Sequence, residues 1–201
     1  MTPTEWAPDL DRDCPVVAFQ GAHGAFSDEV ITTLWQGRAT TRPARDFASV
    51  VRAVVDGHAT HAVLPIENTT IGRIAESCAA IDSARALVTL AEIDVPVIHC
   101  LMGVPGSSLA LVRRALSHPA ALAQCRGFFE AHHAIEAVSA YDTAGAAVQV
   151  AELAQVHVAA IAPARAAALY GLAVLARDIQ DRANNVTRFA IVAHARGAHA
   201  A

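Results

Sequence analysis

The 201-residue chain contains no lysine, because all 15 of its basic side chains are arginines. Schiff-base aldolases, pyridoxal-phosphate enzymes and Walker A nucleotide sites each require a lysine amine, so these classes are excluded. Charged residues make up only 17% of the chain, which is sparse for a soluble domain. We therefore expect more surface than usual to be buried between subdomains or protomers, and any catalysis to rely on groups other than an amine.

Long apolar runs and a basic surface stripe are also missing. Pro163 and Arg165 interrupt the most apolar stretch, 159–176, so no window offers the roughly 20 apolar residues that a membrane span needs. The net charge is -4 and the arginines are dispersed, which argues against binding to nucleic acid. Residues 1–15 lack the basic segment and apolar core of a secretory leader. We therefore expect a cytoplasmic protein that binds neither nucleic acid nor a membrane.

Nothing in the sequence predicts a metal site or a cofactor. His58 and His61 are split between a turn and a strand, which is a poor arrangement for metal ligands. The cysteines form no Cys-x-x-Cys pair, and we expect each to be a free, buried, small apolar side chain. They are Cys14, Cys78, Cys100 and Cys125. Alanine is abundant, at 46 residues, so the 54% hydrophobic content describes mostly small side chains.

Apolar strands and amphipathic helices alternate along the chain, which is typical of α/β folds with helices covering parallel sheets. Asp46 and Gly57 are the expected start and end signals of one helix. Strands are expected at 15–20, 61–66, 135–138, 158–162 and 187–193. Helices are expected at 25–35, 46–56, 71–83, 108–116, 119–131, 143–153 and 163–170.

Two extended runs, near Leu90 and near Ala173, interrupt this alternation. The first contains Pro96, which favours two short strands joined by a crossing segment. Two crossings of this kind predict two α/β lobes with a cleft between them. The expected lobes are 1–90 plus 176–201, and 91–175. Ligands of such folds bind at the carboxyl ends of strands, so the loops after the strands are candidate sites.

Two of these loops precede helices in the first half of the chain. Segment 21–27, GAHGAFS, places two glycines before a helix start, where backbone N–H groups can bind an anion. Segment 64–72 places Glu67 and Asn68 at the end of a strand. Asn68 or Thr69 could equally be a simple cap for the next helix.

Ser117 and Gln124 are seven residues apart, which is close to two helical turns, so their side chains can point the same way. Alternatively, Ser117 caps a helix that has Pro119 in its first position. Thr143 opens an alanine-rich helix whose small side chains leave the N-terminus accessible to a carboxylate.

Segment 184–189, NNVTRF, enters the last expected strand. Side chains alternate along a strand, so Thr187 and Phe189 should face one side of the sheet. Arg188 should face the other, where it is either structural or a ligand.

Taken in order, these segments resemble the catalytic domain of prephenate dehydratase. The motifs that carry the resemblance are GAHGAFS at 21–27, LPIENT at 64–69, SHPAALAQC at 117–125, DTAGAA at 142–147 and NNVTRF at 184–189. The resemblance implies a two-lobed fold like that of type II periplasmic binding proteins, with the active site in the cleft. It also implies a cofactor-free carbon–oxygen lyase and a homodimer. The implied reaction converts prephenate to phenylpyruvate, water and carbon dioxide in phenylalanine biosynthesis.

The resemblance also implies the site residues. The threonine of TRF, regarded as the essential hydroxyl, falls on Thr187. The residues expected to bind the substrate are Asn68, Ser117, Gln124, Glu67, Thr143, Arg188 and Phe189. The sequence departs from the family pattern at Ala22, Arg73 and Gly145, where proline, a small residue and alanine are common. Gly145 could loosen its helix start, and Arg73 could add a cation near the cleft or point to solvent. We expect no regulatory ACT domain, because the chain stops at Ala201.

Two alternatives remain open. A dehydratase that also accepts arogenate would keep every motif. A non-catalytic two-lobed binding protein would share the fold, since a fold alone does not fix a function. The joint presence of Thr187, Asn68, Ser117 and Gln124 argues against this second alternative.

Overall fold

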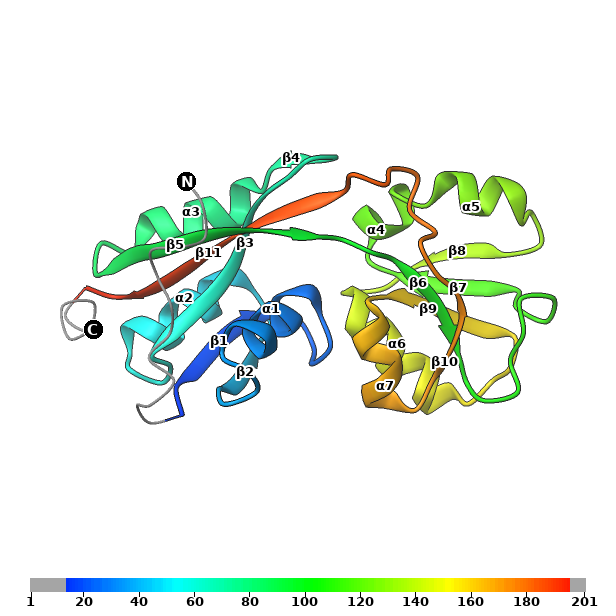
Figure 1. Cartoon of the computed structure of the whole chain (residues 1–201), viewed down its shortest axis with the longest axis horizontal. Coiled ribbons are helices and arrows are strands. Elements are labelled where there is room, and N and C mark those ends of the chain that lie inside the picture. Colours follow the sequence, from blue (N-terminus) through cyan, green and yellow to red (C-terminus); the bar gives the residue numbers. More distant parts are fainter. Residues whose placement is uncertain (1–13, 196–201) are drawn as a thin grey trace. The chain divides into compact units, whose positions relative to one another are not determined.

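The computed structural model describes residues 14–195, which form two compact units. Unit 1 contains residues 14–20, 27–96 and 186–195 of this part of the chain, and unit 2 contains 21–26 and 97–185 (Figure 1). The expectations about a leader and about a regulatory domain fall on or beyond residues 1–13 and 196–201. They therefore lie outside the described residues.

In the described residues, unit 1 is a mixed sheet with three helices. Its strands are β1 (Val16–Gln20), β2 (Thr40–Ala44), β3 (His61–Asn68), β4 (Gly72–Arg73), β5 (Leu87–Pro96) and β11 (Val186–His194). Its helices are α1 (Phe26–Leu34), α2 (Phe47–Val55) and α3 (Ala75–Ser83). The strand order is β2-β1-β3-β11-β5, with β4 paired to β3. Strands β1 to β3 run parallel, whereas β11 is antiparallel to both of its neighbours.

The sequence signals around α2 act as expected. Asp46 accepts a hydrogen bond from the backbone N–H of Ser49 at 2.7 Å, and Gly57 follows the helix with a φ of 74°. The buried valines of α2, including Val50 and Val54, pack with every second residue of β3 and β11. Apolar residues thus recur about every 3.6 positions on the helix and every 2 positions on the strands. They face one another and form one core.

Unit 2 has a five-stranded sheet in the order β10-β6-β9-β7-β8. Its strands are β6 (Cys100–Gly103), β7 (Arg114–Ser117), β8 (Glu136–Ser139), β9 (Val158–Ala162) and β10 (Ala173–Ala176). Its helices are α4 (Pro119–Ala123), α5 (Arg126–Ala131), α6 (Thr143–Leu153) and α7 (Ala164–Tyr170). All five residues of β9 are buried.

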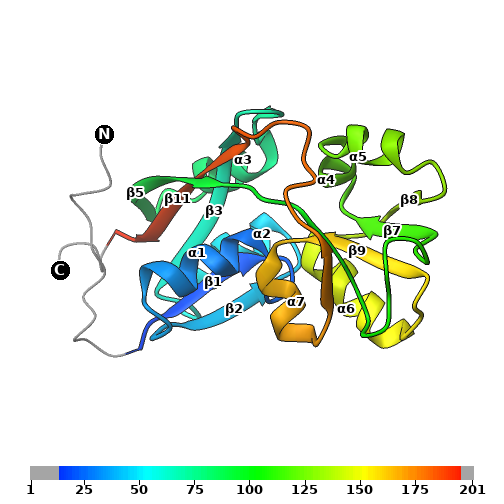
Figure 2. The ribbon, with the colours of Figure 1, turned by 45° about the vertical axis from the view of Figure 1, so that its right-hand side comes forward.

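Small side chains allow the elements of unit 2 to pack closely. Helices α6 and α7 lie side by side in both ribbon views (Figures 1 and 2), and their buried alanines join those of β9 in one core cluster. Gly24 has a φ of 86°, and a Cβ placed there would lie 3.0 Å from the Cα of Ala166. Part of the alanine content therefore lies where backbones approach one another closely.

Several expectations about the elements were wrong. Both sheets are mixed, not parallel, because β11 inserts antiparallel between β3 and β5 and β6 pairs antiparallel with β9. The short polar strand β2 was missed because TTRPA has no apolar alternation. The helix expected at 108–116 is a turn followed by β7, and the helix expected at 119–131 is broken between α4 and α5. Only Cys100 and Cys125 are buried, whereas Cys78 is half-buried and Cys14 is exposed.

The two-unit α/β class is confirmed, but the crossing points differ from those expected. Strand β5 stays paired with β11 through Pro96, and β11 starts at Val186. The chain therefore passes between units at 96/97 and 185/186, not near 90 and 176. Residues 21–26, expected in the first lobe, belong to unit 2.

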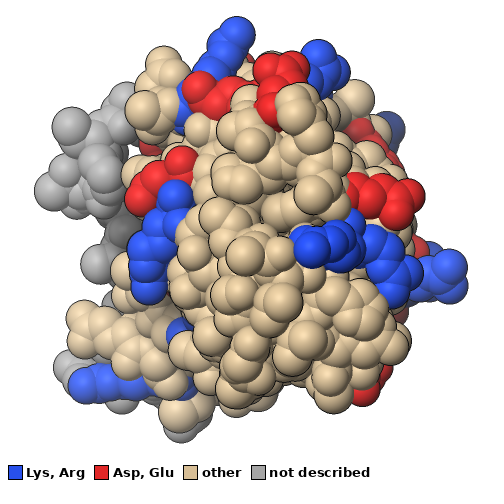
Figure 3. Space-filling view, turned by 90° about the vertical axis from the view of Figure 1, so that its right-hand side faces the viewer, with Lys and Arg blue, Asp and Glu red and all other residues tan. Residues whose placement is uncertain are grey.

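The face drawn in Figure 3 is sparsely charged, as the composition predicts. On the face drawn in Figure 3, uncharged residues predominate, and arginines and acids gather mainly toward the edges. Among the helices that the structure describes, none is long and apolar enough to cross a membrane.

Candidate functional site

Thr187 and Asn68 form a buried polar pair in unit 1. They are in register at the start of β11 and the end of β3, and they are 7% and 4% exposed. The Asn68 Nδ2 donates to the Thr187 Oγ1 at 2.8 Å and to the Val186 carbonyl at 3.1 Å. Because an amide N–H already donates to Oγ1, the hydroxyl hydrogen of Thr187 is directed to another acceptor. The pair therefore presents Thr187 as a hydrogen-bond donor.

Asn68 also fixes the turn after β3. Its Oδ1 accepts the backbone N–H groups of Thr70 at 2.8 Å and Ile71 at 3.2 Å. The expected helix start at about Ile71 is thus wrong: the turn leads into β4, and α3 begins only at Ala75. Asn68 does cap local backbone, but in an Asx turn, and the same amide holds Thr187 through its other end.

Arg188 and Glu67 lie on the opposite face of the sheet from Thr187, as strand alternation predicts. Arg188 donates to Asp94 from Nε at 2.8 Å and forms an ion pair with Glu67 at 3.7 Å. The hydrogen bond from Arg188 lowers the pKa of Asp94 and raises that of Arg188. Phe189 is 2% exposed and packs in the core of unit 1. These contacts agree with a structural role for Arg188. Its role in binding substrate stays a prediction.

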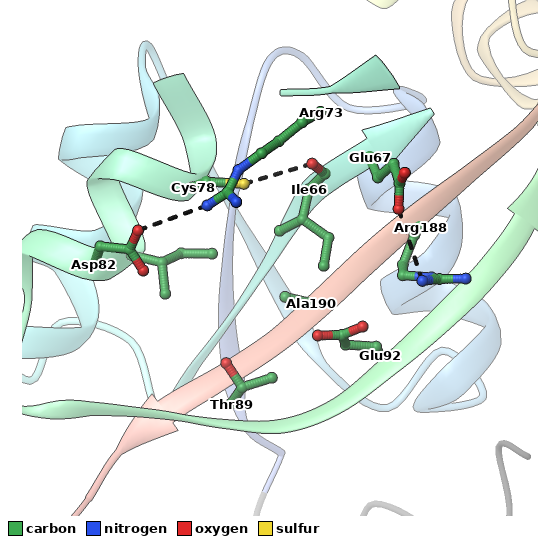
Figure 4. Close-up of a pocket in the computed structure, with 10 residues that line it drawn as sticks. Ile66, Glu67, Arg73, Cys78, Asp82, Thr89, Glu92, Arg188 and Ala190 are labelled. Atoms are coloured by element: carbon green, nitrogen blue, oxygen red, sulfur yellow. Dashed lines mark hydrogen bonds and ion pairs between the residues drawn. The ribbon is translucent and has the colours of Figure 1, made fainter. Parts of the chain in front are cut away.

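A pocket of about 400 Å³ opens on this second face (Figure 4). Glu67 and Arg188 approach each other across β3 and β11, and Arg73 pairs with Asp82 of α3 at 3.8 Å. The Arg73 and Asp82 side chains are 71% and 73% exposed, so Arg73 is a solvent-facing cation on β4. Each arginine that lines this pocket is thus already paired with an acid.

In unit 2, Ser117 ends β7 and is fully buried. Its Oγ donates to the Ile161 carbonyl of β9 at 2.6 Å. The N-cap of α4 is His118, whose side chain accepts from the Ala120 N–H at 3.2 Å, with Pro119 in the first helical position. The alternative in which Ser117 itself caps the helix is therefore wrong, although the proline is placed as expected.

Ser117 belongs to β7 and Gln124 is the C-cap that follows α4, so the two do not share a continuous helix face. The Oε1 of Gln124 instead accepts from His99 Nε2 at 2.8 Å and from Asn185 Nδ2 at 3.0 Å. Neither His99 nor Asn185 is among the site residues expected from the sequence. A histidine within the apolar run VIHCLMG was the available signal.

The start of α6 already holds a carboxylate from the chain itself. Asp142 accepts from the Gly145 N–H at 2.6 Å, and a Cβ on Gly145 would lie 2.9 Å from the Asp142 Oδ2. The glycine therefore makes room for this cap and does not leave the helix start unsecured. Binding of a substrate carboxylate beside Thr143 stays a prediction.

Within residues 14–195, no group of three or more histidine, cysteine or acidic side chains is arranged to hold a metal ion. The candidate chemistry consists of neutral donors: the Thr187 hydroxyl and the Asn68 amide in unit 1, and the Gln124 amide in unit 2. These groups can bind anions and support a departing oxygen without carrying a formal charge.

Burial of His99 makes the stability of the protein depend on pH. Desolvation lowers the pKa of His99 from 6.5, against an opposing hydrogen bond to Gln124. The unfolded chain therefore binds more protons than the folded one between the lowered pKa and about 6.5, so stability is lost as pH falls through this window. Burial likewise lowers the pKa of His61.

We expect the free energy of unfolding to fall as the pH falls below about 6.5, by at most about 1.4 kcal/mol per pH unit for each histidine. Urea denaturation at several pH values measures this slope. The slope should be shallower for His99→Phe, and an equal slope in the variant would contradict this assignment. His58→Phe is the control, because His58 is exposed.

Comparison with known proteins gives one family. The profile described as prephenate dehydratase matches residues 17–197. A protein of Komagataeibacter europaeus, named bifunctional N-acyl-homoserine lactone acylase/prephenate dehydratase, is 42% identical over 88% of this chain and 62% of its own length. Arogenate dehydratase/prephenate dehydratase 1, chloroplastic, of Arabidopsis thaliana is 41% identical over 94% of this chain and 47% of its own.

Solved structures agree with the sequence comparison. Prephenate dehydratase from Arthrobacter aurescens, in complex with L-Phe, has a TM-score of 0.82 at 31% identity. The match covers 89% of this chain and 60% of that one. The chain thus spans less than two thirds of the length of each of these three proteins.

Proposed function

Because the chain belongs to the prephenate dehydratase family, we propose that it converts prephenate to phenylpyruvate, water and carbon dioxide. The observation that carries the proposal is the buried Asn68–Thr187 pair, in which an amide donates to a hydroxyl at 2.8 Å. This pair joins two of the motifs on which the family resemblance rests.

The chemistry needs little from the protein beyond binding and one proton donor. The bond between the ring and its carboxyl group breaks, its electron pair enters the ring, and hydroxide leaves from the opposite ring carbon with a proton to form water. Formation of the aromatic ring drives the reaction. The protein must hold two carboxylates, align the two breaking bonds and stabilise the departing oxygen.

We assign Thr187 to the departing oxygen. Its hydroxyl hydrogen is directed away from Asn68, so it can donate to the hydroxide as the carbon–oxygen bond breaks. A threonine hydroxyl is a very weak acid, so the proton itself comes through a coupled neighbour or water. Hydrogen bonds that strengthen as charge develops lower the barrier without tightening the binding of the substrate.

Neutral donors suit the carboxylate that is lost. A strong ion pair would stabilise the charge that must disappear, whereas an amide such as Gln124 holds it more weakly. The absence of lysine is consistent with this requirement. The arginine nearest in sequence to Thr187, Arg188, is engaged by Asp94 and Glu67 on the other face of the sheet.

The test is a direct assay of the purified chain with prephenate and no added metal, in which phenylpyruvate and carbon dioxide are both measured. We expect the two products in equal amounts. Failure to form phenylpyruvate, in a preparation that unfolds cooperatively in urea, would contradict the proposal. Treatment with a chelator is the control and should leave the rate unchanged.

A second candidate substrate is arogenate, which would yield phenylalanine directly. The Arabidopsis relative at 41% identity carries both activities in its name, which favours this candidate. Competing prephenate and arogenate in one reaction gives the ratio of their kcat/KM values. An N-acyl-homoserine lactone belongs in the same assay, because the Komagataeibacter relative is named for that substrate as well.

We also propose that the protein is a cytoplasmic homodimer. The family resemblance supports the dimer, and so do the low content of charged residues and the exposed apolar side chains of unit 2, such as Leu111 and Leu169. Light scattering during size-exclusion chromatography measures the mass in solution. A single species of 21.0 kDa would contradict the dimer.

A further inference from the structure

Three buried side chains meet at one amide oxygen in unit 2. His99, Gln124 and Asn185 are 2%, 8% and 2% exposed. The Gln124 Oε1 accepts from both of the others, at 2.8 Å from His99 Nε2 and 3.0 Å from Asn185 Nδ2. These partners are distant in sequence, so the arrangement exists only in the folded unit.

The two donors, His99 and Asn185, fix the orientation of the Gln124 amide. An amide has a C=O end that accepts and an NH₂ end that donates, and the two ends have nearly the same shape. Rotating the Gln124 amide by half a turn would place its NH₂ group against the N–H groups of His99 and Asn185. The pair of donors therefore directs the NH₂ group away from both residues.

His99 is itself held firmly. Its ring packs edge-on against Phe26, with centroids 5.6 Å apart. Its backbone N–H donates to Gln180 Oε1 at 2.9 Å, and its carbonyl accepts from the Ile179 N–H at 3.1 Å. These contacts fix the backbone of His99 and pack its ring against Phe26.

The other ring nitrogen of His99 identifies the tautomer. Nδ1 is buried and finds no hydrogen-bond partner among residues 14–195. A proton on Nδ1 would be a buried donor without an acceptor, whereas a proton on Nε2 is used by Gln124. Burial also lowers the pKa of His99, so the neutral ring is favoured.

We propose that His99, as its neutral Nε2–H tautomer, is a positioning residue that fixes the Gln124 amide with its NH₂ end toward a substrate carboxylate. This inference rests on the proposed dehydratase function. A carboxylate only accepts hydrogen bonds, so a rotated amide would present its own oxygen to another acceptor. The orientation of the Gln124 amide therefore decides whether it attracts or repels the substrate carboxylate.

Kinetics of His99→Phe test the proposal, because phenylalanine keeps a flat ring but cannot donate. We expect KM for prephenate to rise about tenfold to a hundredfold, as for loss of a hydrogen bond to a charged group, with kcat within about threefold. His132→Phe is the matched control. His132 is a histidine of the same unit, half-buried and stacked on Phe128, and its replacement should leave KM within about twofold.

A double-mutant cycle separates positioning from general damage. Gln124→Met removes the amide and keeps the length of the side chain. Adding His99→Phe to Gln124→Met should raise KM by less than about twofold, because His99 acts through the amide. If the fold-increases in KM of the two single variants multiply in the double variant, the proposal is overturned.

The tautomer is measured without reference to activity. In ¹⁵N-labelled protein, the His99 ring should give one pyrrole-type nitrogen at Nε2 and one pyridine-type nitrogen at Nδ1, assigned by comparison with His99→Phe. A proton on Nδ1 would overturn the inference even in an active enzyme. Absence of phenylpyruvate formation by the unaltered protein would instead remove the proposed function, and with it the role of His99 in that reaction.

Discussion

Replacing Thr187 by valine is expected to lower kcat for phenylpyruvate formation by about 10² to 10⁴, with little change in KM. Valine has nearly the shape of threonine but has no hydroxyl to donate to the departing oxygen. Steady-state assays with prephenate measure the effect. A loss of less than tenfold, about 1.4 kcal/mol of barrier, would contradict the central role assigned to this hydroxyl.

Thr187→Ser is the matched control, because serine keeps the hydroxyl and the acceptor for Asn68. We expect it to retain activity within about tenfold of the unaltered protein. Urea denaturation of both variants must accompany the assays, since Thr187 is 7% exposed and a substitution there also affects packing. A large loss in both variants with unchanged stability would point to a steric role for this position.

Replacing Ala166 by leucine is expected to destabilise the protein by about 1–3 kcal/mol. Ala166 is fully buried in α7, and its Cα lies only 3.0 Å from where a Cβ on Gly24 would be. A leucine side chain has no space at such a close approach. The free energy of unfolding from urea titration measures the cost.

Ala168→Leu provides the matched control on the same helix, because Ala168 is exposed. This change should alter the free energy of unfolding by no more than about 0.5 kcal/mol. Equal effects at 166 and 168 would show that helix propensity, and not the packing of α7, accounts for the loss. Destabilisation confined to position 166 would tie the alanine content of the chain to close packing in unit 2.

Strong local signals predicted individual elements well. The bounds of α6 and β9 agree with the pattern of 143–153 and 158–162. Asp46 caps α2 as expected, because an N-cap contact spans only three residues of sequence. Strand alternation likewise placed Thr187 and Arg188 on opposite faces of the sheet.

Other elements escaped prediction because their partners lie far away in sequence. β7 is a strand because Arg114 and its neighbours pair with Val158 and Glu136 on two other strands. The apolar residues in 108–116 fit a helical period equally well, and only the sheet decides between the two. The same holds for β2, which is extended because it pairs with β1.

The sequence by itself determined the absence of lysine chemistry, the two-unit α/β class and the motifs that indicate the family. Composition and short-range periodicity do not depend on tertiary contacts, so they can be read directly from the sequence. The tertiary structure alone decided how the polar groups are used. Asn68 meets Thr187 from 119 residues away, and Gln124 meets His99 and Asn185 from 25 and 61 residues away. Hydrogen-bond geometry at such separations depends on strand register and packing, which no local pattern encodes.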